Sequence, residues 1–383
     1  MLRQFWPVVA VVLIIAGANA HAADQPPITL KLPDEVFIGK AAAFAPDGKT
    51  VVTVGWKKDG LDKAGIYQWD LATGQCKKIY AGTWSGLSDT WAIRWSPDGQ
   101  RVGIFLNPDS HAEACWLDAK TWKLVGHIGY DFYYDLSGDK PVNHYLREKG
   151  FNPFLNAVMP DQSHVFGLGG DQDGKSGVGL LRWDFQKNKT TLIKFEKPDI
   201  RDDYWCPPSI SADGKRIAYG IVAIGMEAFV FDTSTGKELC HVKYMLNDPL
   251  NVPTHHAFLS RSGQYLLTHV NECPSLLAWR VKDGQRRLKR ELNVDSDPQN
   301  RIGRVFQVEP TPKTERFVIN CWKYNQKSKS NIRVYVVDPE AETITQIADD
   351  QKIRKSFLAV SPDEKQVLVP YGEGVRIYPL PAK

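Results

Sequence analysis

The sequence has little net charge and, after its first residues, no long apolar run. Its 383 residues contain 48 Lys and Arg against 44 Asp and Glu, a formal net charge of +4. This balance argues against nucleic acid or an anionic membrane as the partner, because both select strongly basic surfaces. The one basic cluster, from Arg286 to Arg290, is interpreted as a charge-protected sheet edge. Without an apolar run of about 20 residues, no membrane span is expected.

Motifs of familiar catalytic centres are also missing. The chain contains no Gly-x-Ser-x-Gly elbow and no His-Glu-x-x-His motif. The segment from Gly169 to Ser176 matches a phosphate-binding loop in its letters. That chemistry needs a following helix, whereas the pattern after Val178 predicts a strand, so we interpret the segment as a loop. We therefore expect no cofactor and no metal.

Cysteine is scarce. Six cysteines are scattered over the sequence, and a chain of this length can build a core without covalent staples. We expect one or two disulfides at most, with a pairing that the sequence leaves open.

The first 22 residues differ from all that follow. Arg3 is their only charged residue, and nine apolar residues run from Val8 to Ala16 before an Ala-rich end. A positive start, a short apolar core and an Ala-x-Ala end are typical of a secretory signal peptide. We expect residues 1–22 to be a signal peptide and the mature protein to be periplasmic or secreted.

One phrase recurs along residues 23–383: an apolar strand, a Ser-Pro-Asp-Gly-like turn and a second apolar strand. Successive copies are separated by 49 to 63 residues, a spacing that favours one four-stranded propeller blade per repeat. Each copy continues into a third strand, and five of these end in an apolar residue followed by Asp. The seven turns are centred on Asp47, Asp98, Asp161, Asp213, Ser262, Thr311 and Asp363.

The turns, together with the Trp69-Asp70 and Trp183-Asp184 strand endings, resemble WD-repeat propellers and the TolB-like "PD" repeats of bacterial envelope proteins. The resemblance covers essentially the whole mature chain, although no Gly-His pair precedes each first strand. It implies an all-β fold: one seven-bladed β-propeller of four-stranded antiparallel blades over residues 23–383. It also implies that residues 28–32 supply the outer strand missing from the last blade.

Binding residues are expected where the connections are long. In a propeller, the first-to-second and third-to-fourth turns share one face, and these are short here. The other connections share the opposite face, where loops on a rigid scaffold usually carry recognition. Tyr and Trp are common interface anchors. The candidate binding residues are Trp84, Trp91, Tyr130, Tyr133, Tyr134, Tyr145, Asp202, Asp203, Tyr204, Trp205, His255 and His256.

These features favour a monomeric, non-catalytic protein that binds a protein, peptide or glycan outside the cytoplasm. The alternative is a propeller enzyme of the lactonase, glycan-active or quinone-cofactor type, because propellers also host enzymes. In that case Asp89, Asp202, Asp203 and His256 are the first acid or base candidates.

Overall fold

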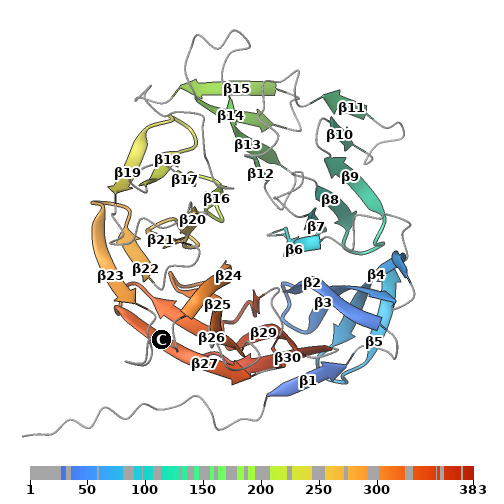
Figure 1. Cartoon of the computed structure of the whole chain (residues 1–383). Coiled ribbons are helices and arrows are strands. Elements are labelled where there is room, and N and C mark those ends of the chain that lie inside the picture. Colours follow the sequence, from blue (N-terminus) through green and yellow to red (C-terminus); the bar gives the residue numbers. More distant parts are fainter. Residues whose placement is uncertain are drawn as a thin grey trace, which may run out of the picture.

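The structure is a computed structural model, shown in Figure 1. It describes residues 27–31, 36–57, 60–80, 90–96, 98–106, 114–128, 132–135, 142–145, 156–158, 163–169, 179–184, 189–194, 208–221, 227–243, 255–270, 275–291, 302–323, 331–350, 352–353, 358–371 and 374–383.

The described residues form antiparallel strands and no helix. In chain order, the sheets are as follows. The first is β2 (Val36–Phe44), β3 (Thr50–Lys57), β4 (Gly60–Asp70) and β5 (Cys76–Tyr80); the second is β6 (Thr90–Trp95), β7 (Arg101–Leu106), β8 (Ala114–Asp118), β9 (Leu124–Ile128), β10 (Phe132–Asp135) and β11 (Val142–Tyr145); the third is β12 (Asn156–Val158), β13 (His164–Gly169), β14 (Gly179–Asp184) and β15 (Lys189–Lys194); the fourth is β16 (Ser209–Ile210), β17 (Arg216–Ile221), β18 (Glu227–Asp232) and β19 (Glu238–Lys243). The fifth is β20 (His255–Leu259), β21 (Tyr265–Val270), β22 (Ser275–Arg280) and β23 (Gln285–Glu291); the sixth is β24 (Ile302–Pro310), β25 (Phe317–Lys323), β26 (Asn331–Asp338) and β27 (Thr343–Asp350); the seventh is β28 (Ala359–Val360), β29 (Gln366–Tyr371), β30 (Gly374–Pro379) and β1 (Ile28–Lys31).

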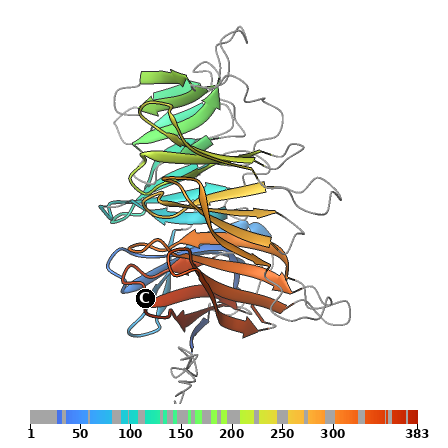
Figure 2. The ribbon, with the colours of Figure 1, turned by 90° about the vertical axis from the view of Figure 1, so that its left-hand side faces the viewer.

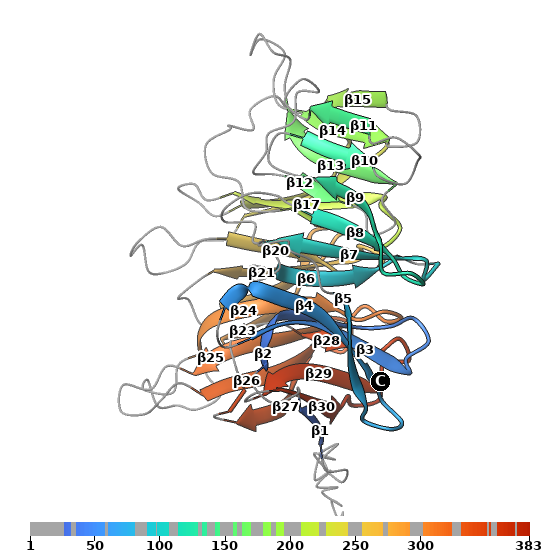
Figure 3. The same ribbon diagram turned by 90° about the vertical axis from the view of Figure 1, so that its right-hand side faces the viewer.

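The sheets follow one another around a ring, with the first strand of each nearest the centre (Figure 1). Seen from either side, they lie one above another in a body that is thinner than it is wide (Figures 2 and 3). The N-terminal strand β1 pairs antiparallel with β30, so that Ile28 lies opposite Ile377 and Lys31 opposite Gly374. The all-β class and the four-stranded antiparallel sheets are as the sequence predicts.

The second sheet departs from the prediction. Its order is β11-β10-β9-β8-β7-β6, which is six strands instead of four. The segment expected to be one long connection, residues 126–153, contains β10 and β11. Phe, Tyr and Val favour strands, and this local preference identifies part of the long interval as sheet.

The recurring turns have one hydrogen-bonding pattern. In the second sheet, the Ser96 hydroxyl donates to Asp98 Oδ1 over 2.6 Å and accepts the Arg101 N–H over 2.9 Å. Gly99 has a φ of 70°, which glycine adopts without steric cost. Ser211 with Asp213, and Ser361 with Asp363, repeat the hydroxyl–carboxylate bond. The Ser-Pro-Asp-Gly signature therefore specifies a tight hairpin.

The aspartates that end the third strands cap the next turn. Asp118 Oδ1 accepts the N–H groups of Lys120 and Thr121 at 3.1 and 2.7 Å. Asp232 accepts those of Ser234 and Thr235 in the same way. The residues before these two aspartates, Leu117 and Phe231, are buried, and so is Trp69 before Asp70. The apolar-Asp pair thus joins the core to a capped turn.

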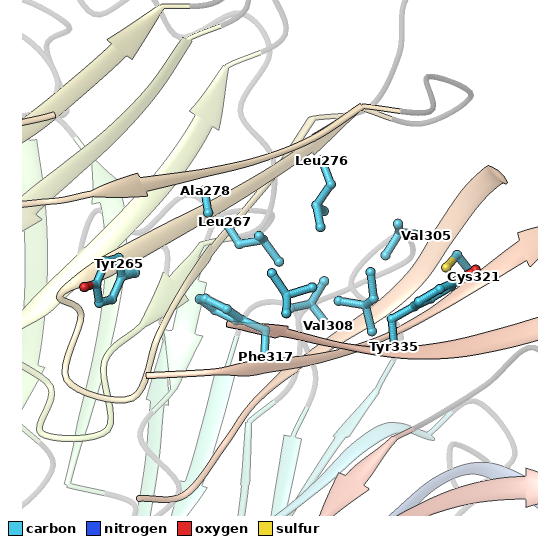
Figure 4. Packing of buried hydrophobic residues seen from close by; sticks show 11 residues of the cluster. Tyr265, Leu267, Leu276, Ala278, Val305, Val308, Phe317, Cys321 and Tyr335 are labelled. Carbon is cyan, nitrogen blue, oxygen red and sulfur yellow. The ribbon is translucent and has the colours of Figure 1, made fainter. Parts of the chain in front are cut away.

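The core is divided among the interfaces between neighbouring sheets. Between the fifth and sixth sheets, for example, Leu267 and Ala278 pack against Val308, Phe317 and Tyr335 (Figure 4). Alternate residues of β21 face opposite neighbours, since Leu267 joins this cluster and Leu266 joins the cluster with the fourth sheet. The fifth sheet is therefore apolar on both faces, and its strands lack a clean polar side.

Candidate functional site

The ends of the sheets that carry the recurring turns, here called the short-turn end, are tied together by contacts between neighbouring sheets. Arg216 Nη1 donates to the carbonyl of Ser262 over 3.2 Å. The Ser260 hydroxyl donates to Glu315 in the sixth sheet. These bonds occupy polar groups of the turns, so the short-turn end is stabilised internally.

The tie between the sixth and seventh sheets is centred on Glu364. Its carboxylate accepts the N–H groups of Lys313 and Thr314, the latter over 2.7 Å. Arg316 lies 3.4 Å from the same carboxylate and donates to the carbonyl of Pro381 over 2.8 Å. Glu364 has a φ of 60°, a left-handed conformation held by glycine in the equivalent turns. The cross-sheet bonds thus come with local backbone strain.

A pocket of about 280 Å³ also lies at the short-turn end, between the β26–β27 turn and the last residues of the chain. Arg316, Asp338 and Lys383 line it. Their side chains are already engaged: Lys383 pairs with Glu340 over 2.5 Å, and Asp338 caps its own turn. None of the sequence-predicted binding residues lines this pocket.

Three of the predicted binding residues lie on the added strands. Tyr133 and Tyr134 belong to β10 and Tyr145 to β11, and the register places Tyr145 opposite Phe132 and Tyr134 opposite Asn143. Their expected place in a connection is therefore wrong. They lie at the outer margin of the second sheet, farthest from the ring centre (Figure 1).

Three further predicted residues lie on inner strands. Trp91 belongs to β6, and His255 and His256 belong to β20, the first strand of the fifth sheet. His256 lies opposite the buried His269, whose Nε2 accepts the Val305 N–H over 3.2 Å. The two neighbouring histidines were expected in a connection, and the structure places them near the ring axis instead. The remaining candidates, Trp84, Tyr130, Asp202, Asp203, Tyr204 and Trp205, lie outside the described residues.

An ion pair near the ring centre was not anticipated from the sequence. Arg94 on β6 donates through Nη2 to Glu309 Oε2 on β24 over 2.6 Å, and through Nη1 to the carbonyl of Ile93 over 3.0 Å. The Glu309 side chain is 13% exposed and that of Arg94 34%. Burial raises the pKa of Glu309, and the Arg94 guanidinium opposes that rise. The pair joins the second and sixth sheets, which are not neighbours in the ring (Figure 1).

The structure places the two residues of this pair at one position of the repeat. Ser96 and Thr311 are equivalent, because each donates its N–H to the carbonyl five residues on, and Arg94 and Glu309 each lie two residues earlier. The equivalent position is small in three other repeats, which have Ala43, Ser209 and Ala359, and is Phe258 in the fifth. The sequence alone missed this signal, because centring the sixth turn on Thr311 puts Glu309 two residues out of register with Arg94.

A second polar cluster lies on the fourth sheet, at the end opposite the turns. His241 Nε2 is 2.7 Å from Glu227 Oε2, and Lys243 Nζ is 2.8 Å from Glu227 Oε1. The His241 ring stacks on Phe229 with centroids 4.1 Å apart. Burial works against the charge of Glu227, but the bonds from Lys243 and His241 hold its pKa below the usual range. The arrangement holds a carboxylate ionised beside an imidazole.

The cysteines of the described part show no reactive thiol. Cys76, Cys115, Cys240 and Cys321 are free, while Cys206 and Cys273 lie outside the described residues. Burial raises the pKa of Cys76 and of Cys240 to about 11, which keeps both thiols protonated. The described ranges also contain no group of three or more His, Cys, Asp or Glu arranged to hold a metal, and no helix long and apolar enough to cross a membrane.

Comparison with known proteins finds similarity in structure alone. No known family model and no curated relative matches the sequence. Among solved structures, the β-propeller domain of Cps50 (Swd1) from Myceliophteria thermophila is 11% identical with a TM-score of 0.58, over 93% of this chain and 100% of that one. The Dos1 propeller is 13% identical with a TM-score of 0.56, over 93% and 96% of the two chains. An oligogalacturonate lyase in complex with manganese is 12% identical with a TM-score of 0.56, over 93% and 97%. At these identities the likeness shows the fold and nothing more: the chain is a β-propeller.

Proposed function

We propose that this chain is an exported, non-catalytic β-propeller that binds a protein, peptide or glycan partner outside the cytoplasm. In this proposal the seven sheets are the blades of one ring, and β1 completes the last blade through its pairing with β30. The signal-peptide pattern of residues 1–22 supports export. Binding of a protein partner is supported by a structural neighbour from the mitotic checkpoint complex, a chain that is 12% identical with a TM-score of 0.54 over 99% of this chain and 100% of that one.

The observation that carries the proposal is the aromatic hairpin β10–β11. It is added outside the four strands that a blade needs, so closure of the ring does not require it. Its eight strand residues include Phe132, Tyr133, Tyr134 and Tyr145. Aromatic side chains supply large contact areas and are common anchors of interfaces. An element of this composition that the scaffold does not need supports a role in recognition.

The test compares substitutions of predicted binding residues with a substitution of an exposed residue on the second sheet. Tyr133→Ala with Tyr134→Ala, and separately Trp205→Ala, should abolish capture of a partner from the native envelope without changing the melting temperature. Leu124→Ala is the matched control, because Leu124 is an exposed apolar residue of β9. Unchanged capture by both test variants would reject the proposal.

The alternative is a propeller enzyme. It is favoured by the placement of His256 on the inner strand β20, close to the ring axis. Metal and cofactor analysis of the purified protein separates the two functions. A stoichiometric metal or a cofactor spectrum that is lost in His256→Ala would favour the enzyme.

A further inference from the structure

The outer edge of the second blade differs in composition from the other outer edges. Each of the other six outermost strands contains a fully charged residue: Lys31 in β1, Lys77 in β5, Lys189 in β15, Glu238 in β19, Arg286 in β23 and Asp349 in β27. The outermost strand of the second blade, β11, reads Val142, Asn143, His144 and Tyr145. It contains no Asp, Glu, Lys or Arg.

Charge on an edge strand prevents unwanted pairing. The outer strand of a sheet has backbone N–H and C=O groups on its free side, which can pair with any other extended chain. Lysine and other charged residues on such strands make that pairing costly, because the charge would be desolvated at the new contact. The outermost strands of the other six blades contain such a charged residue, whereas β11 contains none.

The neighbouring strand β10 strengthens this difference in composition between the second blade and the others. Within the part of the chain that is described, β11 pairs with β10 alone, so its second side is an edge of the sheet. The register places Phe132 opposite Tyr145 and Tyr133 opposite His144. A strand added to β11 would therefore extend a sheet margin rich in aromatic residues, the composition that gives favourable cross-strand pairs with aromatic and β-branched neighbours.

We propose that β11 binds an uncharged, extended segment of the partner polypeptide as an additional antiparallel strand. This inference rests on the proposed binding function and specifies its partner as a peptide strand. Main-chain hydrogen bonds to β11 supply affinity, and aromatic or β-branched side chains of the segment supply specificity. A charged residue opposite β11 would find no opposite charge in that strand, so the segment that fits is uncharged.

The direct test measures binding of a synthetic probe to the full mature chain by fluorescence anisotropy. The probe is a fluorescein-labelled, end-capped six-residue peptide in which threonine alternates with tyrosine or valine. Its mirror-image D-peptide is the control for non-specific adsorption, because a strand edge discriminates between the two backbones. We expect the L-peptide to bind at least about tenfold more tightly. Equal affinity of the two peptides would overturn the proposal.

Substitutions locate the contact. Asn143→Lys and His144→Lys introduce the protection that the other edges have, and each should weaken probe binding about tenfold. Thr191→Lys, on the outer strand of the third blade, is the matched control and should leave binding unchanged. The melting temperature of each variant shows whether the fold is intact. Undiminished probe binding by both β11 variants, with the fold intact, would refute the assignment.

Proline substitutions test the backbone contact separately. Successive N–H groups along a strand alternate in direction, so one of Asn143 and His144 donates toward β10 and the other toward the free edge. Proline at the outward position should abolish probe binding while the melting temperature stays the same, because no ladder bond is lost. Probe binding that survives both Asn143→Pro and His144→Pro would exclude strand addition.

The outcomes distinguish this inference from the broader function. If Trp205→Ala abolishes partner capture while the β11 lysine variants capture normally, the chain is a binding propeller whose partner contacts another surface. If sedimentation shows a dimer that Asn143→Lys dissociates, a second copy of this chain occupies the edge and the peptide proposal is wrong.

Discussion

Removing Arg94 should expose how much the ring depends on the ion pair near its axis. Arg94→Met retains most of the apolar side-chain length and leaves the Glu309 carboxylate, 13% exposed, without its cation. Exposed ion pairs contribute about 0–1 kcal/mol, whereas breaking a buried pair costs about 3–5 kcal/mol. Because Arg94 is 34% exposed, we expect an intermediate loss of about 2 kcal/mol in the free energy of unfolding.

Substituting Glu309, the other partner of the pair, should lower the free energy of unfolding by less. Glu309→Gln leaves Arg94 unpaired, but the guanidinium is the more exposed partner and keeps its bond to the carbonyl of Ile93. We expect a loss of about 1 kcal/mol, within the range of a partly exposed pair. The double variant should lose less than the sum of the two single losses, because each single variant leaves an unpaired charge that the double variant lacks.

The pH dependence of stability provides a second test of the ion pair between Arg94 and Glu309. Burial raises the pKa of Glu309 in the folded protein, so the folded state holds its proton more tightly than the unfolded state does. For such a group, stability decreases as pH rises from the unfolded pKa through the folded pKa. Without Arg94 the folded pKa rises further. Acidification from pH 7 to pH 5 should therefore recover part of the stability that Arg94→Met loses.

Thermal unfolding followed by circular dichroism, with urea titrations at both pH values, measures these quantities. For a chain of this size, about 2 kcal/mol corresponds to a fall in Tm of roughly 2.5 °C. Arg216→Met is a comparison variant, because it removes a cross-sheet bond to a neutral carbonyl and leaves no buried charge. Strict additivity in the double variant, or a Tm of Arg94→Met within 1 °C of the wild type, would refute the assignment of a stabilising cross-axis pair.

Three further predictions concern the pairing of β1 with β30 and the turns. Gly374→Ala should release β1 from β30, because a Cβ at this position would lie 2.1 Å from the Leu30 carbonyl oxygen. Limited proteolysis should then cleave the chain near residue 31. An unchanged digestion pattern would contradict the pairing. Glu364→Gly should destabilise the chain by about 1–2 kcal/mol in urea titrations. The substitution relieves the backbone strain of a positive φ, but it also removes the carboxylate that accepts the N–H groups of Lys313 and Thr314, and we expect this loss to be larger. A gain in stability would show that the strain dominates. The hydrogen bond from the Ser96 hydroxyl holds the pKa of Asp98 below its usual range, so the stability it gives is present at neutral pH and lost as pH falls through the folded pKa. Ser96→Ala should raise that pKa in a carboxyl NMR titration, and an unshifted titration would show that the bond does not form in solution.

The sequence predicted the repeating unit well because that unit is local. The Ser-Pro-Asp-Gly turns fold through bonds that join residues within five positions of one another, as between Ser96 and Arg101. The same holds for the aspartate caps, where Asp118 bonds to Thr121. A pattern of this kind is written in consecutive residues, so its meaning needs no knowledge of the rest of the chain.

The candidate site was less accessible to the same reasoning. Tyr133 and Tyr134 were identified as binding candidates from residue type alone, and their location on β10 was missed because four-residue strands in a long interval carry little periodic signal. His256 was assigned to a connection for a similar reason. Its strand, β20, has five residues with the sequence His-His-Ala-Phe-Leu, which does not alternate between polar and apolar residues.

The sequence by itself determined the local elements of this protein: the paired strands on either side of each recurring turn, the tight turns and their aspartate caps. Only the tertiary structure decided which distant side chains meet, as when Arg94 reaches Glu309 across 215 positions. It also decided that the second sheet continues to β11 and where that sheet ends. The physical reason is that hydrogen bonds within a turn depend on neighbouring residues, whereas ion pairs and sheet edges depend on the curvature that all the blades impose together.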